Sequence, residues 1–291
     1  MSTTTPRSAN HEPANHQDRA LARHRVTSSL SMTAKIIVLL IALFLTLGPV
    51  VWTLVTALTP TDAAGHRTLS LAAFRDVFSK VDVIRLFWNS TLVTGLCAIG
   101  QMLTAALAGY AFARLRFRGA NLLFGIILAT MMIPMQVTIV PVFMLIRGMH
   151  LADTLLALIL PAIPTAFGTF LMRQYFMGIP DTLAEAAEVD GASPWTIFRS
   201  IYLPLATPGM AIVGILAFNS IWNDFFRPLI MTISEENFTL PLGLVSLQGQ
   251  LGTGSMSTIL AGVVLSMIPA LIVFIIGQRP LREGLTAGAV K

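Results

Sequence analysis

The sequence is poor in charged residues and contains a single cysteine. Only 11% of its 291 residues are charged, whereas 55% are hydrophobic. Soluble domains carry about 25% charged residues. The lone Cys97 excludes a disulfide or a cysteine-based metal site within one chain. A composition this apolar predicts a protein that is built into a lipid bilayer.

Motifs for nucleotide binding and for metal chemistry are also missing. No Gly-x-x-x-x-Gly-Lys-[Ser/Thr] run occurs, so the chain has no phosphate cradle of its own. No His-Glu-x-x-His or paired-cysteine spacing is present, and we interpret the scattered histidines as solvated or interfacial side chains. We therefore expect no catalytic residue, no metal and no cofactor bound by this chain.

Ionisable residues are nearly absent from the interiors of the apolar segments. Ion-driven carriers use buried Asp, Glu, His or Arg side chains to carry the coupling charge. Here only Asp224 stands close to the end of such a segment. An ion-coupled carrier would therefore lack its charge relay, and a membrane enzyme would lack a nucleophile or metal set. A transporter with this sequence would have to obtain its energy from a partner.

Long apolar runs, in contrast, are abundant. A helix needs about 20 apolar residues to cross a bilayer, and we predict six such helices. They cover residues 36–58, 88–113, 120–142, 154–172, 208–226 and 257–277. Prolines within the third and fourth of these segments predict kinks. The expected fold is an all-α membrane protein with six transmembrane helices.

The distribution of Lys and Arg orients these helices with both termini in the cytoplasm. The cluster of Arg114, Arg116 and Arg118 stands at the end of a predicted span, and the cytoplasmic segments hold more cations than the outer loops. The same orientation explains the formal net charge of +5 without a nucleic-acid partner. It places Arg227 in an outer loop.

Three regions are expected along the chain. Residues 1–34 form a polar tail without an apolar period, which predicts a disordered cytoplasmic segment rather than a cleaved signal peptide. Residues 35–279 form the transmembrane domain, which includes a cytoplasmic hairpin at residues 177–206. Residues 280–291 form a cytoplasmic C-terminal tail.

The hairpin is a compact polar segment between the fourth and fifth predicted spans. Thr182 and Glu185 have the spacing of a capping box at the start of a short helix. Asp190-Gly191 is a turn signal in which glycine supplies a positive φ. Ser193 is expected to cap a second helix, whose apolar stripe is formed by Trp195, Ile197, Phe198 and Ile201. The hairpin is either a docking surface for a partner or a well-capped loop without one.

The full spacing of the hairpin resembles the signature of the membrane subunits of ATP-binding-cassette importers. Nine residues separate Gly191 from Ile201, in the run Glu185-Ala186-Ala187, Asp190-Gly191-Ala192 and Ile201-Tyr202-Leu203-Pro204. Its Asp-Gly-Ala form resembles the sugar importers. Trp222-Asn223-Asp224, followed by Pro228-Leu229, resembles the end of the fifth helix in maltose-type carbohydrate permeases. The chain is similar to the smaller, six-helix partner of such a permease pair.

This resemblance implies a type I importer permease with the MetI-like fold, a non-catalytic subunit in the bacterial cell membrane. It also implies a second permease subunit, an extracellular solute-binding protein and a dimer of cytoplasmic ATPases that bind ATP and Mg. In that family the hairpin docks in a groove on the ATPase. The implied coupling residues are Glu185, Ala186, Ala187, Asp190, Gly191, Ala192, Ile201, Leu203 and Pro204.

The solute path is less marked in the sequence. Polar residues within or near the ends of spans include Asn89, Ser90, Thr91, Gln101, Tyr110, Gln136, Asn219 and Asn223. Hydrogen bonding between helices explains most of them, because buried polar groups in lipid need partners. The path candidates that we retain are Gln136, Asn219, Trp222, Asn223 and Asp224, with Trp222 offering an aromatic face to a sugar ring.

The expected solute is a mono-, di- or oligosaccharide that the solute-binding protein delivers. The alternative is glycerol 3-phosphate, a glycerophosphodiester or another polyol. A phosphate-bearing solute would require a cation along the path, and the predicted spans contain none.

Overall fold

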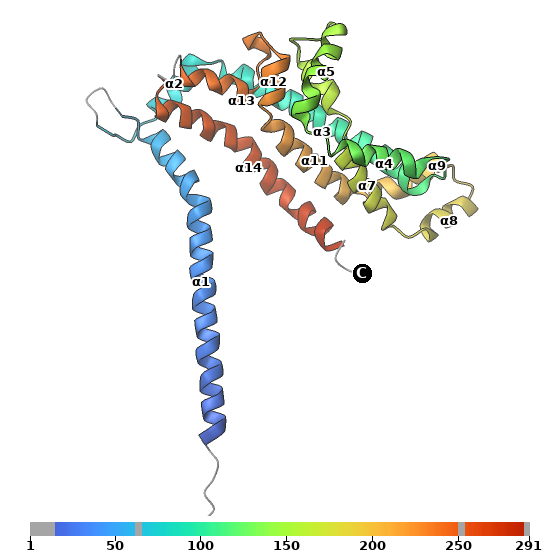
Figure 1. Cartoon of the computed structure of the whole chain (residues 1–291), viewed down its shortest axis with the longest axis horizontal. Helices are drawn as coiled ribbons and strands as arrows, with labels where there is room; N and C mark the ends of the chain where they lie inside the picture. The colour runs from blue at the N-terminus through green and yellow to red at the C-terminus, as the bar shows by residue number, and fades with distance from the viewer. Residues whose placement is uncertain (1–14, 62–65, 250–253, 288–291) are drawn as a thin grey trace, which may run out of the picture. The chain divides into compact units, whose positions relative to one another are not determined.

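The computed structural model describes residues 15–61, 66–249 and 254–287 (Figure 1). The described residues are mostly helical, with one isolated bridge between Thr61 and Arg67. The chain divides into two compact units, Met1–Val55 and Thr56–Lys291. Each unit is described by itself below.

The first unit contains most of the helix α1 (Asn15–Leu58). Its segment Met32–Leu58 is apolar and long enough to cross a membrane, and an 18-residue window of this segment contains no buried residue. A helix that is apolar on all sides requires lipid or a partner around it. The expected span at residues 36–58 is therefore confirmed.

Residues 1–34 were expected to be a disordered tail, and within this range α1 begins at Asn15. Ala, Leu and Arg are strong helix formers and extend the apolar helix into the polar segment. Residues 1–14 lie outside the described part of the chain.

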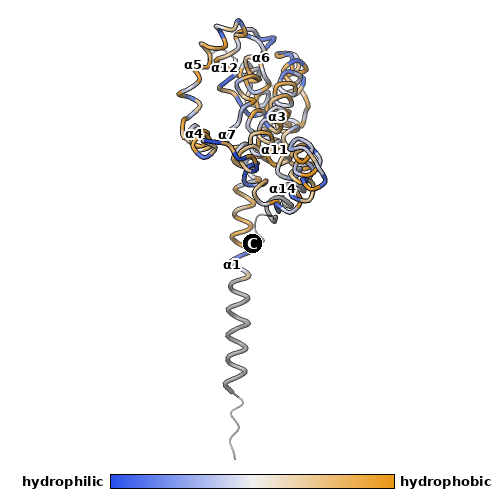
Figure 2. Tube along the Cα trace, turned by 90° about the vertical axis from the view of Figure 1, so that its right-hand side faces the viewer, coloured by the Kyte–Doolittle hydropathy of each residue, from blue (hydrophilic) through white to orange (hydrophobic). Residues whose placement is uncertain are grey.

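In the second unit, the long helix α3 (Val83–Arg114) packs along α7 (Ala166–Met177) and α11 (Thr207–Trp222). The helix α14 (Met256–Ala287) packs on α11 and on the short α2 (Ala72–Lys80). Figure 2 shows hydrophobic residues along most of these helices and hydrophilic residues at several loops. The second and sixth predicted spans are confirmed as single helices.

Small residues allow α3 and α7 to touch at the backbone. A Cβ atom added at Gly109 would lie 2.6 Å from the Cβ atom of Met172, which is closer than real side chains approach. Gly168 likewise faces Ala105. Such contacts are typical of helix pairs in membranes, which are held by close packing rather than by the hydrophobic effect.

The third and fourth predicted spans are broken rather than continuous. The helix α4 (Ala120–Thr130) is followed, after a bend of 102°, by α5 (Met135–Gly148). Pro134 in the break has an extended backbone, so residues 120–142 contain two helices with a break and not one kinked helix. The short α6 (Leu155–Ile159) and η1 (Leu160–Ala162) join α7 at a bend of 40°.

The part between α7 and α11 is the hairpin, and its last turns bend by 70° into α11. The described chain therefore has three helices that could span a membrane, or up to six if each bent pair forms one span. The helix α14 extends to Ala287, beyond the candidate span Met256–Gln278, so the described residues 280–287 of the expected C-terminal tail are helical. Residues 288–291 lie outside the described chain.

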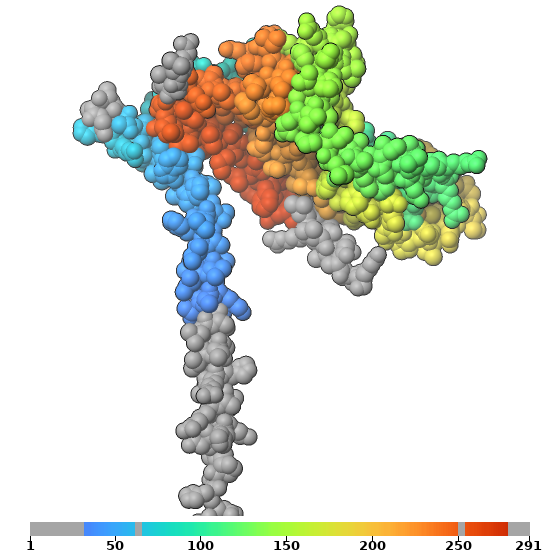
Figure 3. All heavy atoms as spheres, viewed as in Figure 1, coloured from blue at the N-terminus to red at the C-terminus, as the bar shows by residue number. Residues whose placement is uncertain are grey.

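The segment after α11 contains α12 (Phe226–Met231), η3 (Glu235–Asn237), α13 (Leu240–Gly243) and η4 (Leu244–Gln248). Figure 3 shows α12 beside α5, which it contacts. The buried Asn89 donates from Nδ2 to the carbonyl oxygens of Glu236 and Phe238, at 2.8 and 2.9 Å. Asn89 therefore holds this segment on α3, as expected for a polar group that bonds between elements.

Candidate functional site

The hairpin folds as two short helical elements around a glycine turn. The first is α8 (Thr182–Val189), and the second runs through α9 (Pro194–Ile197), the π-helical turn η2 (Phe198–Tyr202) and α10 (Leu203–Leu205). Gly191 lies between them with φ of 81°, which confirms the expected positive φ. The backbone N–H of Ala192 donates to Ala187 at 2.9 Å and closes the end of α8. This bond and the glycine conformation are typical of helix C-termini.

The start of α8 differs from the expected capping box. Thr182 is the first helical residue, Asp181 occupies the N-cap position, and no side chain caps the helix. The carboxylate of Asp181 instead forms an ion pair with Arg114 of α3. The start of the second element is as expected, because Ser193 accepts a hydrogen bond from the backbone N–H of Thr196 at 3.2 Å.

Arg114 connects the end of α3 to the hairpin. Besides Asp181, its guanidinium donates to the carbonyl oxygens of Ile179 and Phe176, the latter at 2.5 Å. The guanidinium also lies 4.9 Å from the ring centroid of Tyr202. Both halves of the hairpin therefore contact one side chain. Sequence reasoning used Arg114 only to assign topology and missed this role.

An aromatic cluster fills the space between the hairpin, α3 and α7. It consists of Tyr110, Phe176, Phe198 and Tyr202, with ring centroids 4.7 to 6.5 Å apart. The hydroxyl group of Tyr110 donates to the carbonyl oxygen of Pro194 at 3.4 Å. Aromatic contacts and this hydrogen bond fix the second half of the hairpin to the side of α3.

The coupling residues implied by the sequence divide between two faces. Glu185, Ala186, Asp190, Gly191 and Pro204 are exposed on the hairpin surface. Ala187, Ala192, Ile201 and Leu203 are half-buried against the aromatic cluster and its neighbours. Ala186 is thus exposed, whereas the small side chains of Ala187 and Ala192 lie partly against their own chain and allow α8 to pack close to it.

The hairpin surface also carries exposed apolar side chains. Trp195, Val189 and Leu183 are exposed, although Trp195 keeps its ring 5.4 Å from that of Phe198. Together with Glu185 and Asp190 they form what we call the outer hairpin face. An exposed apolar and acidic face on a fixed hairpin can dock a partner that offers apolar surface and a cation.

Trp222, the expected sugar-stacking residue, is turned into the chain. It is 2% exposed, and its ring stacks on Phe218 with centroids 5.5 Å apart and 7° between the planes. Its Nε1–H donates to the carbonyl oxygen of Ser266 at 3.0 Å. The chain therefore covers most of the indole, and Trp222 also lines a second cavity, of about 250 Å³, together with Asn223. Asn219, Asn223 and Gln136 are exposed, and Asn223 bonds back to Asn219.

A cavity of about 410 Å³ lies between α3, the bend before α7, α11 and α12. Its polar lining includes Gln101, Thr165, Ser220 and Arg227. None of the retained path candidates lines this cavity, although Asp224 forms an ion pair with Arg227, which does line it. Sequence reasoning counted Gln101 among structural polar residues and did not consider Ser220 or Thr165.

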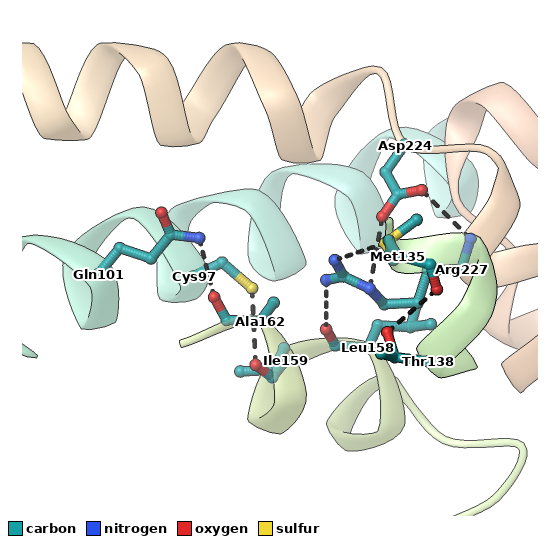
Figure 4. Close-up of polar contacts among 9 residues, drawn as sticks. All are labelled: Cys97, Gln101, Met135, Thr138, Leu158, Ile159, Ala162, Asp224 and Arg227. Carbon is teal, nitrogen blue, oxygen red and sulfur yellow. Dashed lines mark hydrogen bonds and ion pairs between the residues drawn. The ribbon is translucent and has the colours of Figure 1, made fainter. Parts of the chain in front are cut away.

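Arg227 lies inside the unit rather than in a solvated outer loop. Its Nε atom is 3.5 Å from Oδ2 of Asp224, and the two side chains are only 14% and 13% exposed. One terminal nitrogen donates to the carbonyl oxygen of Leu158 at 3.3 Å, and the other lies 3.6 Å from Sδ of Met135 (Figure 4). A cation is therefore available at the cavity, contrary to our expectation. The signal for it was the Asp-x-x-Arg spacing directly after an apolar run.

A second carboxylate joins two loops of this unit. Asp153, with φ of 58°, accepts from the backbone N–H groups of Ile233 and Ser234 and from the Ser234 hydroxyl, at 2.8, 3.0 and 2.5 Å. The Ser234 hydroxyl bond and the backbone bonds stabilise the ionised form and lower the pKa of Asp153 to about 2. We call this group of contacts the Asp153 latch.

Comparison with known proteins places these features in one family. The family model described as "binding-protein-dependent transport system inner membrane component" matches residues 101–282. The arabinooligosaccharides transport system permease protein of Halalkalibacterium halodurans is 37% identical, over 77% of this chain and 80% of that protein. The lactose transport system permease protein of Rhizobium radiobacter is 33% identical, over 87% of this chain and 94% of that protein.

A third relative, the sn-glycerol-3-phosphate transport system permease protein of Salmonella typhimurium, is 34% identical over 68% of this chain and 73% of that protein. Among solved structures, a bacterial ABC transporter involved in the import of the acidic polysaccharide alginate has a chain that is 23% identical. The structural match covers 87% of this chain and 97% of the alginate transporter's chain, with a TM-score of 0.78. That likeness confirms the all-α permease fold. The chain belongs to the family of binding-protein-dependent transport system inner membrane components.

Proposed function

We propose that this chain is one of two permease subunits of an ATP-driven importer for a sugar. The observation that carries the proposal is the hairpin, whose outer face is exposed while its inner face is bonded to α3 through Arg114 and Tyr110. The names of the arabinooligosaccharide and lactose relatives support a carbohydrate as the solute. The second permease subunit completes the translocation path.

The hairpin couples this subunit to an ATPase. Glu185 and Asp190 present carboxylates to a basic residue of the ATPase, and Gly191, with no Cβ atom, lets the partner approach closely. Partial desolvation of such an interfacial ion pair makes it costly to break from one side, by about 2–5 kcal/mol. ATP and Mg stay on the ATPase dimer, and no cofactor is bound by this chain.

The helix α3 transmits the movement of the hairpin to the cavity. Arg114 follows Gln101 by thirteen positions, a distance of about 20 Å along a helix. No proline interrupts α3. Closure of the ATPase dimer therefore pulls on Arg114 and the aromatic cluster and tilts α3 as a rigid rod. This tilt opens the path toward an extracellular solute-binding protein, and hydrolysis resets it.

Reconstitution tests this function directly. Vesicles that hold this chain, the second permease and the ATPases, with the solute-binding protein outside, should accumulate sugar only when ATP is enclosed. Vesicles that hold this chain alone are the control and should accumulate none. Nucleotide-independent accumulation by the chain alone would contradict the proposal and favour a secondary carrier.

A second candidate solute is a phosphorylated polyol such as glycerol 3-phosphate. Arg227 at the cavity offers the cation that such a solute requires, and one relative bears that solute in its name. Competition distinguishes the two candidates. Excess glycerol 3-phosphate should leave sugar uptake unchanged if the solute is a sugar, and it should abolish uptake if the phosphate is recognised.

A further inference from the structure

The cavity lies where the helical backbone is interrupted beside the middle of α3. At the bend before α7, the carbonyl oxygen of Ala162 accepts from Nε2 of Gln101 at 2.8 Å, and that of Ile163 accepts from Thr104 at 3.2 Å. Irregular backbone at membrane depth is tolerated where it is buried in protein or lines a water-filled cavity. Side chains of α3 thus support the broken backbone that forms one wall.

The walls combine apolar surface with polar atoms that have bonding capacity left. Pro161, Pro164 and Phe167 supply apolar surface. Gln101 uses Nε2 for its bond to Ala162, and among the hydrogen bonds of the described residues neither its Oε1 atom nor the hydroxyl group of the exposed Ser220 takes part. A volume of about 410 Å³ lies in the usual range of small-molecule sites, about 300–1,000 Å³.

The charge at the cavity edge is balanced. Arg227 is paired with Asp224, whose Oδ1 also accepts from the backbone N–H of Arg227 at 3.2 Å. A phosphate that approached Arg227 would meet the negative charge of Asp224 at the same place. A hydroxyl group, in contrast, can donate to a carboxylate or an amide oxygen and accept from a guanidinium. The paired charges therefore favour an uncharged solute with many hydroxyl groups.

We propose that this cavity is the section of the solute path that this chain contributes, and that it binds an uncharged polyhydroxyl solute. In this proposal, which rests on the proposed function, the Asp224–Arg227 pair determines specificity against phosphorylated solutes. Gln101 and Ser220 supply the amide oxygen and the hydroxyl group that bind the hydroxyl groups of the solute. The apolar walls cover its C–H faces.

Thiol labelling in the assembled importer tests whether the cavity is a solute site. The background variant is Cys97→Ala, which removes the single cysteine, and Ser220→Cys then places a thiol on the cavity wall. A small water-soluble methanethiosulfonate should label this thiol at least tenfold faster than the thiol of Ile99→Cys. Ile99 is the matched control, because it is an exposed residue of α3 near Gln101 that does not line the cavity. Only the thiolate reacts, so a thiol in lipid is inert.

Protection by solutes then tests the specificity. Lactose or arabinotriose should slow the labelling of the cysteine at position 220 at least threefold, whereas sn-glycerol 3-phosphate should have no effect. Asp224→Asn keeps an oxygen that can accept from the N–H of Arg227 but leaves the guanidinium uncompensated. In that variant, sn-glycerol 3-phosphate should protect and the sugars should protect less.

The outcomes separate this inference from the proposed function. An importer that takes up sugar with ATP, while neither sugar protects the cysteine at position 220, would overturn the inference and leave the function standing. Protection by sn-glycerol 3-phosphate in the presence of Asp224 would overturn the role of the ion pair. Sugar protection without any ATP-driven uptake would contradict the proposed function instead.

Discussion

The contacts of Arg114 make a quantitative prediction about coupling. Arg114→Met keeps the apolar stem of the side chain but removes the donors to two backbone carbonyl oxygens and to Asp181. Hydrogen bonds to charged groups contribute about 1.5–3 kcal/mol each. Loss of the two carbonyl contacts should therefore destabilise the hairpin by about 3 kcal/mol or more.

The two partners of the ion pair should differ strongly in their effects. The side chain of Arg114 is 13% exposed, whereas that of Asp181 is 71% exposed. Solvent screening limits the contribution of such an exposed carboxylate to about 0–1 kcal/mol. Asp181→Asn should thus leave uptake within about twofold of the parent, because Arg114 keeps its carbonyl contacts.

The assay compares ATP hydrolysis with solute uptake in vesicles that hold the complete importer. For Arg114→Met, uptake should fall at least tenfold for each ATP hydrolysed, because the hairpin no longer moves with α3. Arg116→Met is the matched control, since Arg116 lies two residues away and is exposed. Normal coupling in Arg114→Met at normal expression, or equal losses in Arg114→Met and Asp181→Asn, would refute this reasoning.

Three further predictions concern local structure. Gly191→Ala should destabilise the chain by about 1 kcal/mol through the positive φ alone, because nothing lies within 4 Å of the added Cβ atom. Gly125→Ala in α4 should instead stabilise the chain, because the added Cβ atom also meets nothing and φ is not positive there. Thermal unfolding of both variants measures the difference in stability. The Asp153 latch should be fully formed above pH 4 and should open as the pH falls toward about 2, because the folded pKa is depressed. Amide exchange of Ser234 follows this opening, and Asp153→Asn should remove the pH dependence. Trp222→Phe should cost about 1 kcal/mol through the lost bond to Ser266 but leave the KM for sugar unchanged; a changed KM would show that the ring meets the solute.

Sequence patterns predicted the features that depend on neighbouring residues. The apolar run at residues 36–58 indicated the span in α1, and Asp190-Gly191 indicated the turn with positive φ. Ser193 capped the second hairpin helix as its position suggested. These features depend on helix length, glycine conformation and local hydrogen bonding, all of which are determined by residues that are close in the sequence.

Features that depend on tertiary contacts were missed. Asp181 was not assigned a role because its partner, Arg114, lies 67 residues away in the sequence. The burial of Trp222 was not predicted, because only packing against Phe218 determines which way its ring turns. Arg227 was expected in water, since its ion pair and its contact with Leu158 arise only when α12 packs against α6.

The helix breaks show a related difficulty. Prolines marked the third and fourth predicted spans as irregular, and both proved to be broken. The sequence did not distinguish a kink from the 102° bend between α4 and α5, because proline removes one hydrogen bond in either case. Which geometry results depends on the helices that pack around the break.

The central claim is that an ATPase binds the outer hairpin face and thereby drives the movement of this subunit. The most direct test is ATP-driven sugar uptake by the complete importer when the chain carries Glu185→Lys together with Gly191→Pro. The account predicts that uptake falls to the level measured without ATP, while expression and membrane insertion remain normal. Near-normal uptake by this variant would contradict it.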